Sequence, residues 1–373
     1  MDNRLRARIA TFVSIIQAIL FLGHFFIYET WRQFAPASAA GVILGLRIPL
    51  AILSVSFVSA SLLSFRYYNF FVRTFYTLAA VWTGFLNFLF LAACACWIVY
   101  PVVRVSHLPI GRPAIAGTLF SLAILTSVWG LINASWVRLI RISVALPNLP
   151  DAWRGRVAAL VTDTHLGHVR GRHFMSRIVA RLARFQPDII FIGGDLYDGT
   201  KVDLDRVIEP WKEISSRFSI YFVTGNHEEF GDPSRYCEAI ERAGIRVLKS
   251  DKVIVDGLQI LGVQYGHSVD PNSFRSVLEK AELDRNRASV LISHVPSHLN
   301  IPEECGVSLQ LSGHTHGGQV FPFSWFTWRI FGEYTYGLKR FGEMLVYTSF
   351  GAGTWGPPLR VGTHAEIVLI TFE

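Results

Sequence analysis

Hydrophobic and polar positions divide the chain into two halves with different patterns. In the first half, four apolar segments contain no Asp, Glu, Lys or Arg: residues 9–28, 48–65, 74–103 and 113–137. Each is close to the roughly 20 residues that a helix needs to cross the hydrocarbon core of a bilayer. We therefore expect a four-helix transmembrane region, with helices at about 9–28, 45–65, 75–100 and 114–137.

The second half alternates short apolar runs with amphipathic segments. Runs such as "VAALVTD" and "IIFIGGDLYDG" have the pattern of buried strands that end on polar residues, and residues 173–188 have the spacing of an amphipathic helix. Strands that alternate with helices predict a layered α/β domain. Because Pro147 and Pro150 stop the last apolar helix, we expect a transmembrane region over 1–145, a linker over 146–156 and the α/β domain over 157–373.

The net charge of +7 belongs to the first half of the chain. Residues 1–150 hold eleven Arg, no Lys and two acidic residues, a net of +9, whereas residues 151–373 have a net of −2. These basic residues predict membrane orientation rather than nucleic-acid binding. Nine arginines fall on one side of a four-span arrangement and four on the other, which puts both termini in the cytoplasm. The nine are Arg4, Arg6, Arg8, Arg66, Arg73, Arg138, Arg141, Arg154 and Arg156; the four are Arg32, Arg47, Arg104 and Arg112.

Polar residues follow the apolar runs of the second half, at the carboxyl ends of strands, where open α/β sheets place their sites. All are Asp, Asn or His, a donor set that suits Mn²⁺, Fe or Zn²⁺ rather than a thiolate-bound zinc. Carboxylates and imidazoles from separate strands can hold two metal ions about 3.5–4 Å apart, with one carboxylate between them. The residues are Asp163, His165, Asp195, Asp198, Asn226, His227, His294, His314 and His316.

The order of these motifs, D-x-H, GD, GNH, H and GHTH, resembles the calcineurin-like metallophosphoesterase superfamily over about 160–373. The tail, with "GHTHGGQVFPF" and "YTSFGAGTWGPPLRVGTHAEIVLITF", is similar to the YkuE/YaeI-type branch. That branch includes membrane-attached UDP-2,3-diacylglucosamine pyrophosphatases of lipid A synthesis. The resemblance implies a four-layer α/β sandwich and two divalent metal ions, manganese first, with iron or zinc as alternatives.

The resemblance also implies a role for each polar residue. Asp163, His165 and His316 would hold the first metal, and Asn226, His294 and His314 the second. Asp195 would bridge the two. His227 would lie near the leaving-group oxygen, as a proton donor or a stabiliser of the transition state. Two neighbours have alternative roles: Asp198 could orient a ligand or cap a turn, and Glu228 could face solvent or hold His227.

An aromatic run follows the last histidines, from Phe321 to Tyr336. It has two interpretations: a packed loop that covers the sheet, or an interfacial anchor that presents the phosphate of a lipid to the metals. The second makes five residues candidate substrate or membrane contacts: Phe323, Trp325, Phe326, Trp328 and Arg329.

Taken together, the resemblance and the apolar half predict hydrolysis of a lipid-linked phosphodiester or pyrophosphate at the cytoplasmic face of a bacterial inner membrane. The most specific form is conversion of UDP-2,3-diacylglucosamine to lipid X and UMP. The expected partners are the lipid bilayer and the lipid-linked phosphate, not nucleic acid. One alternative is action on another phospholipid or a soluble nucleotide, with the membrane half only as an anchor. Another is a membrane sensor without catalysis.

Overall fold

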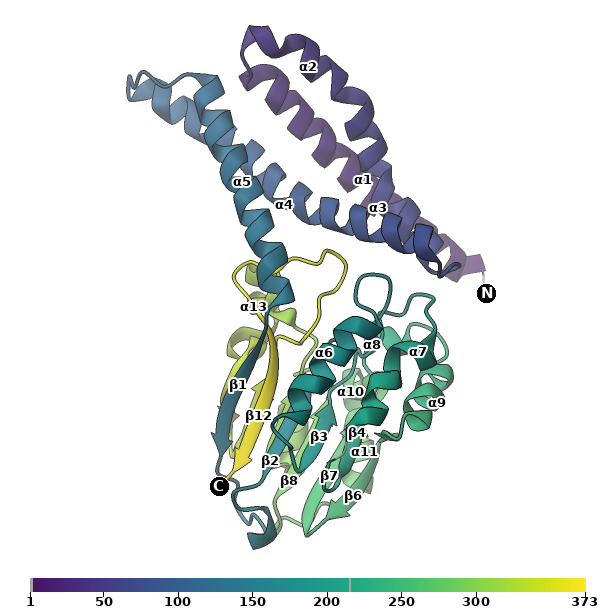
Figure 1. Cartoon of the computed structure of the whole chain (residues 1–373). Coiled ribbons are helices and arrows are strands. Elements are labelled where there is room, and N and C mark those ends of the chain that lie inside the picture. The colour runs from purple at the N-terminus through teal and green to yellow at the C-terminus, as the bar shows by residue number, and fades with distance from the viewer. Residues whose placement is uncertain (1–2, 215) are drawn as a thin grey trace. The chain divides into compact units, whose positions relative to one another are not determined.

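The computed structural model describes residues 3–214 and 216–373, which form two compact units (Figure 1). The first unit comprises Met1–Ile132 with Gly356–Leu359, and the second comprises Asn133–Trp355 with Arg360–Glu373. Each unit is described separately below.

Four long helices make up the first unit and confirm the prediction of four apolar helices. They are α1 (Asn3–Phe34), α3 (Arg47–Ser64), α4 (Phe70–Val105) and α5 (Arg112–Ser135), and each is long and apolar enough to cross a membrane. A short turn, η1 (Ala37–Ala39), and α2 (Ala40–Gly45) join α1 to α3. Many of their large apolar side chains are exposed, as in Phe12, Leu22 and Ile48, so a bilayer is the environment that would cover them.

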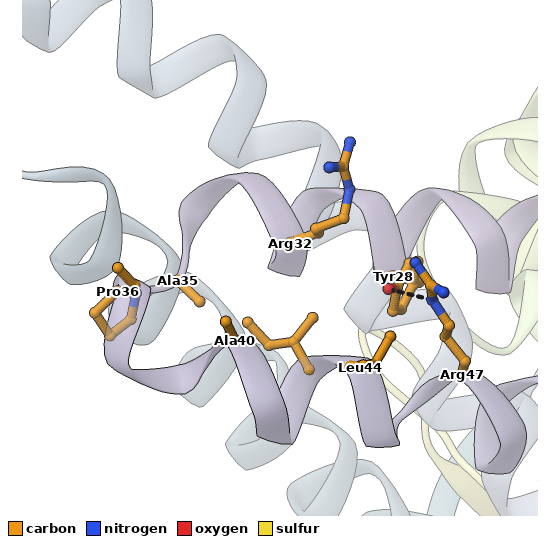
Figure 2. Close-up of a pocket in the computed structure, with 9 residues that line it drawn as sticks. Tyr28, Arg32, Ala35, Pro36, Ala40, Leu44 and Arg47 are labelled. Carbon is orange, nitrogen blue, oxygen red and sulfur yellow. Dashed lines mark hydrogen bonds between the residues drawn. The ribbon is translucent and has the colours of Figure 1, made fainter.

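A hollow of about 250 Å³ lies where α1, α2 and α3 meet (Figure 2). Arg32 and Arg47 both line it. The Arg47 Nε donates a hydrogen bond to the hydroxyl of Tyr28 at 2.7 Å, and Arg32 pairs with Glu29 at 2.8 Å. Arg32 and Arg47 therefore lie at the same end of the α1–α3 pair, as the four-span arrangement expects.

The second unit begins earlier than the expected boundaries at 145 and 157. Strand β1 (Val137–Val144) follows α5 after a single residue, Trp136, and pairs in parallel with β12 (Ala365–Phe372). The segment after it, expected to be a linker, is packed: Leu149 and Trp153 are buried in the core. Sequence periodicity could not reveal this, because β1 is stabilised by pairing with the last strand of the chain.

Two six-stranded mixed sheets form the centre of the second unit. The first has the order β1-β12-β2-β3-β4-β5, and the second has the order β10-β11-β9-β8-β7-β6. In the first sheet lie β2 (Val157–Val161), β3 (Ile189–Ile192), β4 (Ser219–Phe222) and β5 (Arg246–Val247). In the second lie β6 (Asp251–Val255), β7 (Leu258–Val263), β8 (Ser289–Ser293), β9 (Leu309–Ser312), β10 (Gly337–Phe341) and β11 (Met344–Thr348).

Helices cover the outer face of each sheet, which completes four layers. Helices α6 (Arg172–Ala183), α7 (Leu204–Ile208) and α9 (Ser234–Arg242) pack on the first sheet (Figure 1). Helices α11 (Pro271–Lys280) and α12 (Asn300–Glu304) pack on the second. The inner faces share one apolar core, to which Leu160, Phe191, Ile260, Ile292 and Leu311 contribute. The predicted four-layer α/β sandwich is confirmed.

The central strands are buried along their whole length because they are covered on both faces. All residues of β3, β8 and β9 are buried, which explains why β3 and the middle of β8 are continuous apolar runs rather than alternating ones. Gln310, within β9, is a buried polar exception whose amide nitrogen donates a hydrogen bond to the Ser312 hydroxyl at 3.1 Å. The expected ligands follow these strands, after each strand ends.

Trp153 offers a test of whether the segment 146–156 is part of the folded core. Its side chain is fully buried, packs on Phe218 and Phe372, and donates a hydrogen bond to the carbonyl of Val255 at 2.9 Å. We expect Trp153→Ala to destabilise the unit by about 3–5 kcal/mol, because it leaves a cavity between the sheets. Thermal unfolding of the purified protein in detergent measures the effect.

Ile254→Ala is the matched control, because Ile254 lies on edge strand β6 and is 56% exposed. This substitution should change stability by no more than about 0.5 kcal/mol. Equal melting temperatures for the two variants would mean that the 146–156 segment is a free linker after all.

Candidate metal centre

The carboxyl ends of five strands, three from the first sheet and two from the second, converge on one site. Asp163 comes two residues after β2 and Asp195 three residues after β3. Asn226 and His227 follow β4 and open the short helix α8 (Asn226–Glu229). From the second sheet, His294 comes directly after β8, and His314 and His316 follow β9. All seven expected ligands and His227 are therefore brought together by the docking of the two sheets.

Asp163, His165 and His316 form a first group whose ligand atoms face one another. The Nε2 atoms of His165 and His316 are 3.0 Å apart. The Asp163 Oδ1 lies 3.4 Å from the His316 Nε2 and 4.0 Å from the His165 Nε2. One carboxylate and two imidazoles at these separations can bind a single ion.

Asp195, His294, His314 and Asn226 form a second group. The Asp195 Oδ2 is 3.2 Å from the His294 Nε2. The Nδ1 of His314 lies 2.9 Å from the amide oxygen of Asn226 and 3.3 Å from the His294 Nε2. The same Asp195 oxygen is 3.9 Å from the His165 Nε2 of the first group. Asp195 is therefore the carboxylate that lies between the groups.

This donor set fits a pair of divalent cations. Imidazole nitrogens that face each other at close range are poor partners unless one of them is protonated, whereas a shared cation satisfies both. Oxygen and imidazole ligands suit manganese, iron or zinc. The orientation of the rings is also supported from behind, because the Nδ1 of His294 donates a hydrogen bond to the carbonyl of Gly193 at 2.7 Å, and such partners fix the tautomer that binds a metal.

The backbone is strained at most of the expected metal ligands themselves. Five of the seven expected ligands have a positive φ, which non-glycine residues rarely adopt. Each such residue costs about 1–3 kcal/mol and persists only where the surrounding structure holds it, commonly at functional sites. The five are Asp163 (54°), His165 (48°), Asp195 (50°), His314 (68°) and His316 (47°).

Two glycines allow the strand ends to approach each other. A Cβ at Gly225 would overlap the Asp195 carboxylate, and a Cβ at Gly313 would overlap the Asp163 carboxylate. Both glycines directly precede an expected ligand, Asn226 and His314. A side chain at either position would therefore push one ligand away from the others.

Burial and mutual charge shift the pKa values of the clustered groups. Burial raises the pKa of Asp163, and burial together with the neighbouring His294 lowers the pKa of His314 to about 3. His294 differs: burial lowers its pKa, but the charge of Asp195 and the hydrogen bond to it raise the value to about 10. Without a metal ion, protonated His294 therefore forms an ion pair with the Asp195 carboxylate. A metal cation would have to displace the proton from the His294 ring.

His227 lies at the edge of the cluster. Its Nδ1 must donate a hydrogen bond to the carbonyl oxygen of Asp198 at 2.9 Å, because a carbonyl can only accept. Its Nε2 points toward the ligands, 4.0 Å from the Asp195 Oδ2. Asp195 and His165 together with His227 also lie within reach of one ion, so distance by itself does not separate a ligand role from a proton-donor role.

Asp198 lies beside His165, one of the expected ligands, and its role in orienting that ligand stays a prediction. Its Oδ1 faces the Nδ1 of His165 at 3.6 Å, which is longer than a hydrogen bond. The Asp198 side chain is only 10% exposed, and burial raises the pKa of its carboxyl group to about 7. The interpretation of Asp198 as a helix or turn cap has no hydrogen bond to support it among the described residues.

Glu228 does not face solvent, and its side chain does not hold His227; both expectations are wrong. The side chain is fully buried. Its two oxygens accept hydrogen bonds from the backbone N–H groups of Asp195, Tyr197 and Gly225. Burial, followed by the charge of Asp195, raises its pKa to about 8. Glu228 therefore fixes the backbone of the residue between the two groups, a role that only the folding of α8 onto β3 creates.

Arg360 is a site residue that sequence reasoning missed. It is fully buried and donates hydrogen bonds to the carbonyls of His316, Phe350 and Gly353. Its guanidinium also lies 3.1 Å from the Nδ1 of His316, and burial lowers its pKa to about 10. A single arginine in a Gly- and Pro-rich stretch carries no signal of burial, so the sequence offered no means to find it.

Two exposed aromatic rings beside His227 were also missed. The ring of Phe230 lies 4.6 Å from that of His227, and the ring of Trp355 lies 6.2 Å from it, between centroids. The two side chains are 65% and 59% exposed. Gln319 holds Trp355 by two hydrogen bonds, one in each direction between side chain and backbone. The side of the site that carries His227 is therefore bordered by apolar surface open to the surroundings.

The aromatic run after His316 forms a helix, α13 (Phe323–Phe331), rather than the loop that we expected. None of its residues is buried. The interpretation as a packed loop over the sheet is therefore wrong for this segment. The role of Phe323, Trp325, Phe326, Trp328 and Arg329 as membrane or substrate contacts stays a prediction.

Comparisons with known proteins agree with this geometry. The family model described as calcineurin-like phosphoesterase matches residues 157–318. An uncharacterized metallophosphoesterase of Campylobacter jejuni is 29% identical over 236 residues, which cover 62% of each chain. A transmembrane protein with metallophosphoesterase domain from Danio rerio is 30% identical over 270 residues, 66% of this chain and 60% of its own. The uncharacterized metallophosphoesterase YkuE of Bacillus subtilis is 25% identical over 238 residues, 60% of this chain and 82% of its own.

The chain spans 62% and 60% of the lengths of the Campylobacter jejuni and Danio rerio relatives, so the similarity concerns a domain rather than whole proteins. The matched residues include Asp163, Asp195 and His316, and they extend over strands of both sheets. The part of the chain that follows the four apolar helices therefore carries a calcineurin-like metallophosphoesterase domain.

Proposed function

We propose that this protein is a membrane-bound phosphoesterase that uses two divalent metal ions to hydrolyse a lipid-linked phosphodiester or pyrophosphate. The observation that carries the proposal is the convergence of two ligand groups on the shared carboxylate of Asp195, beside a histidine bordered by exposed aromatic rings. Our most specific form of the proposal is hydrolysis of UDP-2,3-diacylglucosamine to lipid X and UMP.

In this proposal Asp163, His165 and His316 hold one ion, and Asn226, His294 and His314 hold the other, with Asp195 shared. When bound, the ions would neutralise the phosphate and lower the pKa of a water so that it attacks phosphorus near neutral pH. The protein contributes a rigid arrangement: buried Glu228 and Arg360 hold the backbone of Asp195 and His316. Manganese is our first choice for the metal, and iron and zinc have the same preference for these ligands.

His227 is the proposed proton donor to the leaving oxygen. Because its Nδ1 hydrogen is used by the Asp198 carbonyl, the neutral ring has no hydrogen on the Nε2 that faces the site. Donation from Nε2 therefore requires the imidazolium form. Burial, followed by the charge of His165, lowers the pKa of His227 below 6.5, so the donor form decreases as pH rises through that lowered value. The negative charge of a bound phosphodiester or pyrophosphate would favour the imidazolium.

Apolar surface at the leaving-group side favours a lipid over a soluble nucleotide. Phe230 and Trp355 flank His227 and are more than half exposed. Exposed aromatic side chains beside a site commonly bind the apolar part of a ligand. The excess of arginines on the side of the termini supports a cytoplasmic catalytic domain, and the lipid A substrate would place the protein in a bacterial inner membrane. In the alternative, a soluble nucleotide with the helices only as an anchor, the same rings would stack on the base, but the four apolar helices would have no part in binding the substrate.

The substrate is tested first with the purified full-length chain. In mixed micelles with Mn²⁺, we expect UMP to be released from UDP-2,3-diacylglucosamine, as measured by chromatography. A nitrophenyl phosphodiester and cyclic nucleotides serve as soluble comparisons. Cleavage of the nitrophenyl ester without UMP release would retain the phosphoesterase and discard this lipid. A higher kcat/KM for a cyclic nucleotide than for any lipid would favour the anchor alternative.

Metal content tests the shared role of Asp195. We expect about two ions per chain in the wild type and the loss of at least one in Asp195→Asn, because this carboxylate lies next to both ligand groups. Elemental analysis after removal of free metal measures the ratio. Asp151→Asn is the control, since the Asp151 side chain is 97% exposed. Full metal content in Asp195→Asn would remove Asp195 from the bridging position.

Substitution of His227 tests the proton-donor role. His227→Asn should lower kcat for a lipid substrate by roughly 10²–10⁴-fold, the usual contribution of a general acid, with metal content unchanged. The loss should be smaller for the nitrophenyl ester than for a lipid phosphodiester with an alkoxide leaving group, because nitrophenolate departs without a proton. The decline of kcat/KM toward high pH should disappear in the variant.

His173→Ala provides the control for this series, because His173 is exposed on α6. It should retain the activity and the pH profile of the wild type. If His227→Asn lost a metal ion, or lost equal activity on both leaving groups, His227 would be a metal ligand rather than the proton donor.

A further inference from the structure

Helix α13 exposes more aromatic surface than a helix in water normally does. Phe323, Trp325, Phe326 and Trp328 are 52–56% exposed and Ile330 is 74% exposed. The helix has nine residues, none of them buried, so these side chains are not part of the core of the second unit. An exposed apolar patch of this kind marks a surface that a membrane or another protein covers.

The helix is nevertheless fixed to the metal-ligand segment at both ends. At its start, the backbone of Phe323 packs so closely on Gly318 that a Cβ there would overlap it, and the Ser324 N–H donates to the carbonyl of Val320. At its end, the ring of Phe331 lies 6.2 Å from that of His314. Just beyond, the Thr315 hydroxyl donates to the carbonyl of Thr335 at 2.8 Å. Its position is therefore set by the same residues that present His314 and His316.

The last turn of α5 is bonded to the segment from which α13 starts. The Asn133 side chain donates hydrogen bonds to the carbonyls of Arg360 and Thr363, at 2.9 and 2.8 Å. The Thr363 hydroxyl donates in turn to the carbonyl of Gln319 at 3.0 Å. Asn133 belongs to the second unit, so this network lies within that unit. It connects the end of an apolar helix to the residues just before α13.

The end of α5 is also where the membrane boundary is expected. At 1.5 Å per residue, the 24 residues of α5 span about 36 Å, slightly more than a hydrocarbon core of about 30 Å. Trp136, the next residue, is 58% exposed, and tryptophan is enriched at the boundary between lipid and water. With α5 across a bilayer, a helix tied to this turn by two successive hydrogen-bonded links would lie near the headgroups.

The charge of α13 suits the same environment. Arg329 is the one charged residue between Val320 and Gly332, and its guanidinium lies 6.0 Å from the ring of Trp325. Aromatic rings with a neighbouring cation are typical of helices that lie in the interface of an anionic bilayer.

We propose that α13 is a membrane-docking helix, whose aromatic side chains enter the headgroup region of the bilayer and position a lipid phosphate at the metal centre. This inference rests on the proposed function for the identity of the substrate. The rings of Phe230 and Trp355, which lie beside His227, would then contact the same lipid after it leaves the membrane plane.

A fluorescent label on α13 tests the docking directly. The four native cysteines, Cys94, Cys96, Cys237 and Cys305, are replaced by Ala, and Phe326→Cys is labelled with a nitrobenzoxadiazole dye in proteoliposomes containing anionic lipid. We expect blue-shifted emission that brominated lipids quench and aqueous iodide does not. Asn286→Cys is the matched control: Asn286 is exposed and precedes β8 at the end opposite the ligands, so iodide alone should quench its label.

The quenching pattern shows whether lipid, water or protein contacts α13. Quenching of the Phe326→Cys label by iodide would overturn the proposal, because the helix would face water. Shielding from both quenchers would also overturn it, because the helix would then be covered by protein, such as a second copy of the chain.

A kinetic experiment distinguishes failure of this inference from failure of the proposed function. We expect Trp325→Ser combined with Trp328→Ser to raise the apparent KM for micellar lipid substrate severalfold and to leave hydrolysis of the soluble nitrophenyl ester unchanged. Ile254→Ser, on the exposed edge of β6, should change neither. Equal loss on both substrates would make α13 a structural element, whereas a wild type without nitrophenyl esterase activity would instead refute the phosphoesterase proposal.

Discussion

A buried carboxylate, Asp195, imposes the constraint on which the arrangement of the second unit depends. It is 2% exposed, and a charge that far from water is costly unless other groups compensate it. The compensation comes from both sheets: His227 donates its backbone N–H from the first sheet, and the His294 imidazole approaches to 3.2 Å from the second. Glu228 orients the backbone of Asp195 from behind. The sheets must therefore dock so that the ends of β3, β4 and β8 meet.

The apolar core between the sheets supplies the rigidity that this meeting requires. Five expected ligands hold a backbone conformation that is unfavourable for their residue types. Such strain persists because Leu160, Ile192 and Leu311, each three residues before Asp163, Asp195 and His314, are buried. The free energy gained by packing these residues offsets the strain at the strand ends. The site is consequently preorganised, and divalent cations would find their ligands already in position.

The same stretch of chain joins the metal centre to an apolar surface. His314 and His316 lie at one end of it, α13 follows, and Thr335 returns to bond Thr315. Arg360 and Gln319 connect this stretch to the last turn of α5 through Asn133. One hydrogen-bonded network therefore connects the metal centre, where a water molecule would react, to the exposed apolar surface of α13. A lipid-linked phosphate is the class of substrate that has both kinds of group.

The sequence by itself determined the features that depend on local order. Uncharged apolar runs of about 20 residues can be satisfied only by a bilayer or a large core, so the four helices were predictable. Buried strands such as "VAALV" end where the first polar residue appears, so the ligand residues were predictable as well. Tertiary structure decided what depends on distant pairing: β1 joins the sheet because β12 pairs with it, and Trp153 is core because Phe218 and Phe372 surround it. It also decided that Glu228 and Arg360 are buried beside the ligands, since nothing in the local sequence shows which polar side chain another part of the fold will enclose.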